Sequence, residues 1–225
     1  MNKSLITLSL FSSIFISSNA LSDELKNDTD GFKGFNLGLG LSVLKYNSGY
    51  SDNYGETATS DNVYYHSTNI VPRFDGSYSI KLNDKWLLGA GLTFDLSPFN
   101  GDTYIWPDNV QRTRIRTTNH YALYVNPTYA IDNSLAVFGK LSYHSSNIDA
   151  KWSCPTDYGC INDHMRLDGV GVGLGVKKMI NQSIYVQLEG EYVDYANKNY
   201  SAGTDLWKYS NNDSYSGTLS VGYHF

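Results

Sequence analysis

The chain ends in the stretch Ser214-Tyr-Ser-Gly-Thr-Leu-Ser-Val-Gly-Tyr-His-Phe225, whose residues alternate in character. The odd-numbered positions include Tyr215, Leu219, Val221, Tyr223 and Phe225, whereas the even-numbered positions are small or polar. Successive side chains of a β-strand point to opposite faces, so this alternation predicts a strand with one apolar, aromatic face. Chain termini usually fray in water, and an aromatic end is better placed at a membrane interface, where aromatic girdles occur.

The same alternation recurs upstream. It predicts strands at 34–46, 64–82 and 86–96, a strand ending at residue 130, and strands at 135–144, 169–176, 183–195 and 214–225. Long polar connections alternate with short turns at Asn83-Asp84-Lys85, 131–134 and 179–182. This organisation predicts an all-β, eight-stranded antiparallel up-and-down transmembrane barrel over residues 34–225, with both termini in the periplasm. Pro72 is an objection, because proline cannot donate to a strand ladder.

A soluble barrel of the lipocalin type is the structural alternative. It would turn its apolar face inward and leave the opposite face in water. Within 169–176 that opposite face holds only glycines: Gly169, Gly171, Gly173 and Gly175. Glycine suits a crowded, narrow lumen better than a solvent-facing strand, where its entropic cost has no return. The sequence therefore favours the membrane barrel.

The N-terminus resembles a secretory signal. Lys3 precedes an apolar run from Leu5 to Ile16, and Ser18-Asn19-Ala20 follows. A charged start, an apolar middle and a small-x-small site predict a signal peptide over residues 1–20, cleaved after Ala20. The alternative is a short amphipathic helix. Residues 21–33 then form a short periplasmic leader. The apolar run is too short for a membrane-spanning helix.

Composition and cysteine content bear on which ligands the chain could bind. The chain has 225 residues, 19 tyrosines, 20 glycines and a formal net charge of −5. An acidic chain is not expected to bind nucleic acid. Cys154 and Cys160 are the only cysteines. In an exported protein this pair predicts a disulfide that closes a small loop, rather than a zinc site with His164, so no metal or cofactor is expected.

Three segments carry a family resemblance. The segment from Asn126 to Lys140 resembles its counterpart in the OmpA, OmpX and Ail barrels, while Gly190-Glu-Tyr-Val-Asp-Tyr195 and Val221-Gly-Tyr-His-Phe225 resemble the opacity-type porin-like family. The resemblance covers nearly the whole exported chain. It implies an adhesin, a serum-resistance factor, a structural anchor or a narrow channel. It also implies that the barrel assembly machinery reads Tyr223 and Phe225 as an assembly signal.

Alternation places several charged residues inside the barrel. These are Arg73, Asp75, Lys81, Asp95, Lys140, Lys177, Glu189 and Glu191. The interior of an eight-stranded barrel is just filled by side chains, and unpaired charges there are costly. We therefore expect an ion network that plugs the lumen; a gated pore is the alternative.

The segment His144-Ser145-Ser146-Asn147 raises an enzymatic alternative. It resembles the His-x-Ser-Asn motif of the lipid A deacylase PagL, which implies His144 as the base and Ser146 as the nucleophile. The segment departs from that family in two ways. It lies mid-chain, and no Glu that could orient His144 occurs between Ala150 and Gln187. Omptin proteases are a further enzyme class, but they use ten strands.

The segment Gln111-Arg-Thr-Arg-Ile-Arg116 is the one basic cluster. Strand spacing puts Arg112, Arg114 and Arg116 on one face, and parity with Tyr121 and Leu123 makes that face inward, where the arginines would pair with Asp95 or Glu191. If the ladder twists or projects beyond the membrane, the same row would face outward. It would then bind polyanions such as lipopolysaccharide phosphates or heparin-like glycans.

Together these patterns predict a non-enzymatic, integral outer-membrane barrel. Its surface loops would act in adhesion, surface interaction or envelope integrity. The expected partners are outer-membrane lipids and lipopolysaccharide, the assembly machinery, and a host or matrix ligand. A lipid A-modifying enzyme and a narrow porin-like channel stay open as alternatives.

Overall fold

The computed structural model describes residues 28–53, 62–105, 112–153, 162–202 and 205–225. The strands are β1 (Gly34–Asn53), β2 (Asn62–Lys81), β3 (Trp86–Asp95), β4 (Phe99–Ile105), β5 (Arg112–Ala130), β6 (Leu135–Ser153), β7 (Asn162–Met179), β8 (Ile184–Tyr195), β9 (Lys198–Ala202) and β10 (Asp205–His224). Within the described ranges no helix is long and apolar enough to cross a membrane.

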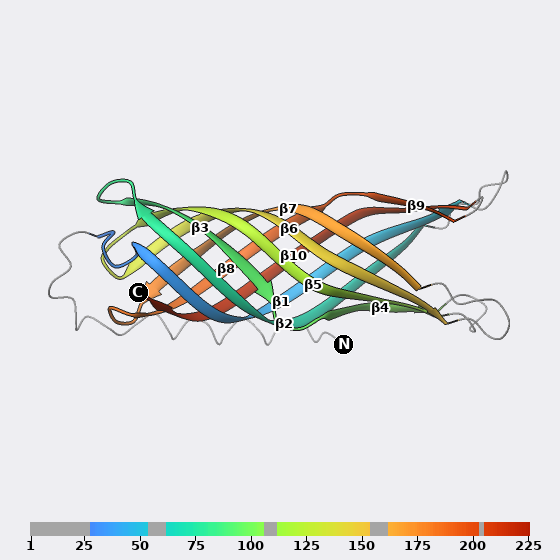
Figure 1. Cartoon of the computed structure of the whole chain (residues 1–225), viewed down its shortest axis with the longest axis horizontal. Helices are drawn as coiled ribbons and strands as arrows, with labels where there is room; N and C mark the ends of the chain where they lie inside the picture. The colour runs from blue at the N-terminus through green and yellow to red at the C-terminus, as the bar shows by residue number, and fades with distance from the viewer. Residues whose placement is uncertain (1–27, 54–61, 106–111, 154–161, 203–204) are drawn as a thin grey trace, which may run out of the picture.

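Eight of these strands close into an antiparallel barrel. The order β1-β2-β3-β5-β6-β7-β8-β10 follows the chain, and β10 pairs with β1 to complete the ring. That closing pair keeps one register from Asn36 opposite His224 to Asn47 opposite Asp213. Figure 1 shows the tilted strands wrapping around one long axis. The predicted eight-stranded, up-and-down barrel is confirmed.

The outer face of the barrel is apolar and the inner face is largely polar. In β1, Leu39 and Leu41 are 61% and 59% exposed, whereas Ser42 is fully buried. In β10, Val221 is exposed and Ser220 is buried in the same alternating manner. This arrangement is the reverse of a soluble barrel and excludes the lipocalin-type alternative.

Three short turns lie at one end of the barrel, which we call the turn end (Figure 1). They join β2 to β3, β5 to β6 and β7 to β8. Each contains an Asn or Asp whose Oδ1 accepts two backbone amides: Asn83 from Lys85 (2.9 Å) and Trp86 (3.0 Å), Asp132 from Ser134 (2.7 Å) and Leu135 (2.9 Å), and Asn181 from Ser183 (2.9 Å) and Ile184 (2.8 Å). The predicted turns are confirmed, and they share one mechanism.

The opposite end, which we call the loop end, differs from the sequence prediction. Within the segments expected as loops at 47–61 and 145–164, the described residues are strand: β1 continues to Asn53, β6 continues to Ser153 and β7 starts at Asn162. Two further strands, β4 and β9, pair with β5 and β10 and extend the wall beyond β3 and β8. The alternation of apolar residues did not predict these strand extensions because they are polar, and backbone pairing does not require an apolar face.

Pro72 is accommodated where β3 ends. It lies opposite Leu41 of β1, and its carbonyl oxygen accepts the amide of Leu96 (2.8 Å) just beyond β3. The pairing of β2 with β3 begins one residue later, at Arg73 opposite Asp95. The proline therefore lies at the end of that ladder, where its missing N–H costs little.

A β-bulge interrupts β5. Its register with β6 shifts between Thr118 and Tyr121, and Asn119 has a φ of 51°. An extra residue in one strand exchanges the two faces beyond it. On the turn-end side of the bulge His120 and Ala122 are buried. On the loop-end side Thr117 is buried and Arg116 is exposed. The inward-facing residues of β5 are therefore even-numbered on the turn-end side of the bulge and odd-numbered on the loop-end side.

The lumen is layered. Its turn end holds an apolar cluster in which Phe32, from a turn preceding β1, packs among side chains from the wall: Leu87, Ala130, Ala136, Met179 and Tyr185. Two further apolar clusters lie in the loop-end half, one around Tyr46 and Tyr195 and one around Leu44 and Val71. The charged residues described below form a further part of the buried interior.

The inward glycines of β7 leave room for neighbouring side chains. A Cβ on Gly175 would clash with the ring of Phe138 and would lie 2.7 Å from the carbonyl oxygen of Leu188. The glycine alternation therefore reflects a crowded interior, as the sequence predicts.

Candidate functional site

The centre of the lumen holds a connected set of charged side chains, which we call the lumen network. Arg73 of β2 donates from Nε to Oδ1 of Asp95 on β3 (2.7 Å), and both residues are buried. The other oxygen of Asp95 lies 2.6 Å from Nδ1 of His120, just below the β5 bulge. Asp95 therefore has a cationic and a hydrogen-bonding partner from two neighbouring strands.

The lumen network continues through a pair of histidines. Nε2 of His120 lies 3.0 Å from Nδ1 of His144 on β6, and the rings stack with centroids 5.2 Å apart. Nε2 of His144 lies 2.9 Å from Oγ of Ser142 and 3.1 Å from Oε1 of Glu191. Ser142 donates to the same Glu191 oxygen (2.7 Å). Asp95 and Glu191 are thus joined across the barrel through two imidazoles.

Lys140 neutralises the carboxylates of β8. Its Nζ donates to Oε1 of Glu189 (2.7 Å) and lies 3.3 Å from Oε1 of Glu191. It also lies 4.7 Å from the ring centroid of Tyr124. The Tyr124 hydroxyl donates to Asp75 (2.7 Å). Arg73 also contacts the carboxylates of β8, because its Nη1 lies 3.9 Å from Oε2 of Glu191.

The structure therefore brings together five of the eight charged residues expected inside the barrel: Arg73, Asp95, Lys140, Glu189 and Glu191. Asp75 joins them only through Tyr124. Lys177 is buried with its Nζ 4.4 Å from the Tyr185 ring, whereas Lys81 lies at the rim and pairs with Asp84 (2.9 Å). Sequence reasoning missed His120 and the role of Tyr124, although both have the even parity of the inward face.

The residues named for catalysis are not arranged as a pair. His144 and Ser146 are both buried on β6, but the hydrogen-bonding neighbours of the His144 ring are His120, Ser142 and Glu191, and its ring also meets that of Tyr195 edge-on. The carboxylate beside the His144 ring comes from Glu191, which lies beyond the segment between Ala150 and Gln187. The serine next to the imidazole is Ser142 rather than Ser146.

The inward placement expected for the basic cluster is wrong for Arg116. Its side chain is exposed, and the acidic residues expected to pair with it are engaged by Arg73, His120 and Lys140. The physical reason is the bulge at Asn119, which reverses the faces of β5. Arg112 and Arg114 lie in the same strand, paired through their backbones with β4 and β6; their side chains are outside the described part.

The predicted disulfide and possible metal sites are the two other kinds of site to consider. Cys154 and Cys160 lie outside the described residues, so their predicted disulfide stays a prediction. Among the residues that the structure describes, no cluster of three or more His, Cys, Asp or Glu side chains could hold a metal ion.

The terminal strand ends in an aromatic cluster. The Phe225 ring lies 4.7 Å from that of Tyr223 and 5.9 Å from that of Phe35, measured between centroids. The amide of Phe225 donates to the carbonyl of Phe35 (2.9 Å). The end of the chain is thus fixed to the start of β1.

A closed antiparallel barrel with an apolar outer face and a polar, filled lumen defines the class of transmembrane β-barrels. The family model described as "Outer membrane protein beta-barrel domain" matches residues 8–225, and the chain belongs to that family. It is accordingly an integral outer-membrane protein.

The chain is similar to several solved outer-membrane proteins at low sequence identity. OprG of Pseudomonas aeruginosa is 13% identical, with a TM-score of 0.50 over 86% of this chain and 96% of that chain. Ail of Yersinia pestis, an attachment invasion locus protein, is 12% identical, with a TM-score of 0.43 over 86% and 99%. The outer membrane protease OmpT of Escherichia coli is 12% identical, with a TM-score of 0.47 over 90% and 99%. No curated protein sequence matches the chain significantly.

Proposed function

We propose that this chain is a non-enzymatic outer-membrane barrel that acts through its outer surface, in adhesion, surface interaction or envelope integrity. The observation that carries the proposal is the lumen network, which links buried charged and polar side chains from five strands across the barrel. A lumen filled in this way supports a scaffold rather than a channel. The strand extensions at the loop end then supply the surface for partners.

The loop end offers a specific surface on β5. Arg116 is exposed, and its cross-strand neighbour in register is Asp149, whose carboxylate binds His164 (2.5 Å). Guanidinium groups bind phosphate and sulfate in a bidentate manner. We therefore propose that the arginine row of Arg112, Arg114 and Arg116 binds polyanions such as lipopolysaccharide phosphates or sulfated glycans.

Salt-dependent binding tests this proposal. Cells that display the triple variant R112Q/R114Q/R116Q should bind immobilised heparin several-fold less than the parent at low salt, and the difference should shrink as salt rises, because exposed charges are screened beyond about 10 Å at 0.1 M. The triple Lys variant should retain part of the binding. R166Q is the matched control, since exposed Arg166 already pairs with Asp168 (2.9 Å). Unchanged binding by the triple Gln variant, with normal heat-modifiable gel mobility, would show that this row is not the site.

A lipid A-modifying enzyme is the second candidate. One observation favours it: Glu191 supplies the acidic partner that a His base needs, and Ser142 lies beside the same imidazole. Burial of all three residues argues against direct access by a lipid substrate. Mass spectrometry of lipid A from cells with and without the gene decides between the two functions; loss of an acyl chain that depends on His144 would establish the enzyme.

Membership of the family supports two proposals, on export and on assembly. We propose that residues 1–20 are a signal peptide, so N-terminal sequencing of the outer-membrane form should begin at Leu21. We propose that Tyr223 and Phe225 are read by the barrel assembly machinery. F225A should then lower the amount of protein in the outer membrane, while the fraction that folds keeps its surface binding.

A further inference from the structure

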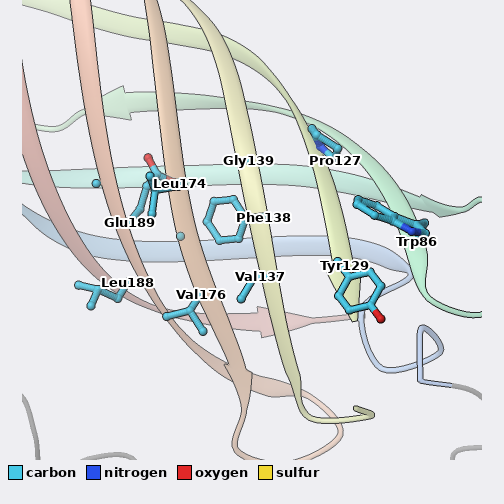
Figure 2. A pocket seen from close by; sticks show the side chains of 12 residues that line it. Trp86, Pro127, Tyr129, Val137, Phe138, Gly139, Leu174, Val176, Leu188 and Glu189 are labelled. Atoms are coloured by element: carbon cyan, nitrogen blue, oxygen red, sulfur yellow. The ribbon is translucent and has the colours of Figure 1, made fainter. Parts of the chain in front are cut away.

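The outer face of the barrel has a hollow near the turn end. A groove of about 720 Å³ crosses β5, β6, β7 and β8, with Trp86 of β3 at its edge (Figure 2). Its apolar lining includes Pro127, Tyr129, Val137, Leu174, Val176 and Leu188. Glu189 also borders the groove, but its carboxylate binds Lys140 in the lumen. The volume lies within the range of roughly 300–1,000 Å³ typical of small-ligand sites.

Two glycines create the hollow. Gly139 and Gly190 occupy outer-face positions, and Leu174 lies between them in register. A Cβ on Gly190 would meet nothing within 4 Å, and a Cβ on Gly139 would meet only Cγ of Pro127 at 3.9 Å. Leu174 is 74% exposed and forms a wall of the groove. Large apolar side chains of the same face, Val137, Val176 and Leu188, border this recess.

The ladder beneath the groove is incomplete. The register between β5 and β6 passes from Val125 opposite Leu141 to Thr128 opposite Phe138, without pairing the two positions between them. Pro127 occupies one of these positions and has no N–H to donate. It still lies opposite Leu88 of β3, so the gap is on the side of Gly139. The proline and the glycine thus hollow the wall together.

Interfacial groups line the turn-end side of the groove. The rings of Trp86 and Tyr129 pack edge to face, with centroids 5.1 Å apart, and such residues favour the headgroup level of a bilayer. Lys178 follows Leu174 and Val176 on the outer face of β7, and its Nζ donates to Oγ of Ser134 (2.8 Å). A lysine at the end of a spanning segment reaches toward the interface. From the groove toward the turn end, the outer face therefore presents first an apolar hollow, then an aromatic edge and then a cation.

We propose that this groove binds one acyl chain of a phospholipid, with Lys178 contacting the phosphate. The groove is continuous with the apolar outer face that contacts hydrocarbon in an outer-membrane protein, so its occupant must be apolar. The cation at its turn end is complementary to an anionic headgroup. Given the proposed orientation, with the turns in the periplasm, the lipid comes from the periplasmic leaflet. The inference is independent of the surface-binding proposal.

Quenching of Trp86 fluorescence by brominated lipid tests the site directly. The chain has four tryptophans, so the variant W106F/W152F/W207F leaves Trp86 as the only tryptophan to be excited selectively. This variant is refolded into phosphatidylcholine vesicles, into which phosphatidylglycerol brominated close to its headgroup is titrated. A bound lipid should make quenching exceed the mole fraction of brominated lipid. G139F or G190F should fill the groove and lower the apparent lipid preference by roughly fourfold or more, the value of one methylene contact.

The controls separate the site from general lipid contact. A90F adds the same side chain to another exposed, outer-face position that does not line the groove, and should leave the preference unchanged. K178Q should reduce the preference for phosphatidylglycerol over phosphatidylcholine. All variants are checked for heat-modifiable gel mobility. Quenching that follows mole fraction in the parent and in G190F alike would overturn the proposal. So would a dimer of the parent that G190F dissociates, because the groove would then receive a second copy.

Discussion

At the scale of single residues, the lumen network depends on charges that neutralise one another. Asp95 is held between Arg73 and His120, and Glu191 between Lys140 and His144. None of these side chains can reach bulk water without leaving the barrel interior. Removing one partner therefore leaves a buried charge with incomplete compensation.

The Arg73–Asp95 pair gives the sharpest residue-scale prediction. R73M should destabilise the barrel by about 3–5 kcal/mol, because Asp95 stays buried with only His120 beside it. The double variant R73M/D95L should recover much of that loss. The measurement is urea unfolding of the protein in lipid vesicles, followed by gel mobility. A single variant as stable as the parent would mean that the pair is not a structural element of the lumen.

Asp132 links one turn to pH. Partial burial opposes its ionised form, but the donors from Ser134 and Leu135 outweigh that effect and lower the pKa of the carboxyl below its ordinary value. The folded-state pKa is thus depressed, so this contribution to stability is present above the unfolded pKa and lost as pH falls through the folded value.

Asn83 and Asn181 occupy the position of Asp132 in the other two turns, which suggests the matched substitution. D132N should keep the turn and flatten the acid limb of stability, whereas D132A should cost about 1 kcal/mol at neutral pH by leaving two amides without their acceptor. Unfolding midpoints measured across acid to neutral pH check both variants. If D132A is neutral, water replaces the carboxylate without loss.

At the scale of elements, the β5 bulge decides which residues meet the lumen. It lets His120 enter the network and turns Arg116 outward. The backbone of Asn119, at a φ of 51°, is in the left-handed region that β-branched residues avoid. N119G should be tolerated, whereas N119V should destabilise the barrel by about 1–2 kcal/mol. Equal stability of the two variants, again by urea unfolding, would contradict this explanation of the bulge.

Sequence reasoning predicted the elements that repeat and missed those that depend on a single irregularity. The alternation in β10 and the glycines of β7 fix which face meets lipid, and the Asn and Asp residues of the turns fix where the chain reverses. The bulge leaves no comparable pattern, because Asn119 lies within a polar run. For the same reason the extensions of β1 and β6 beyond the apolar band had no periodic signal to reveal them.

At the scale of the whole molecule, the proposed orientation predicts that only one end of the barrel is exposed to the cell exterior. With the turn end in the periplasm, protease added to intact cells should cut only the connections of the loop end. Cleavage within 82–85, 131–134 or 180–183 should require permeabilised cells. A cut in one of these turns on intact cells would reverse the proposed orientation. Fragments mapped by mass spectrometry provide the measurement.

The central claim is that the lumen is sealed and the protein acts from its surface. Conductance of the purified protein in planar lipid bilayers tests it most directly. The parent should show no current steps above the lipid background, because the apolar clusters and the lumen network fill the interior. The variant R73A/K140A, which removes the network's cations, should admit ions. Stable, reproducible current steps from the parent barrel would contradict the account and would assign the protein to the channels.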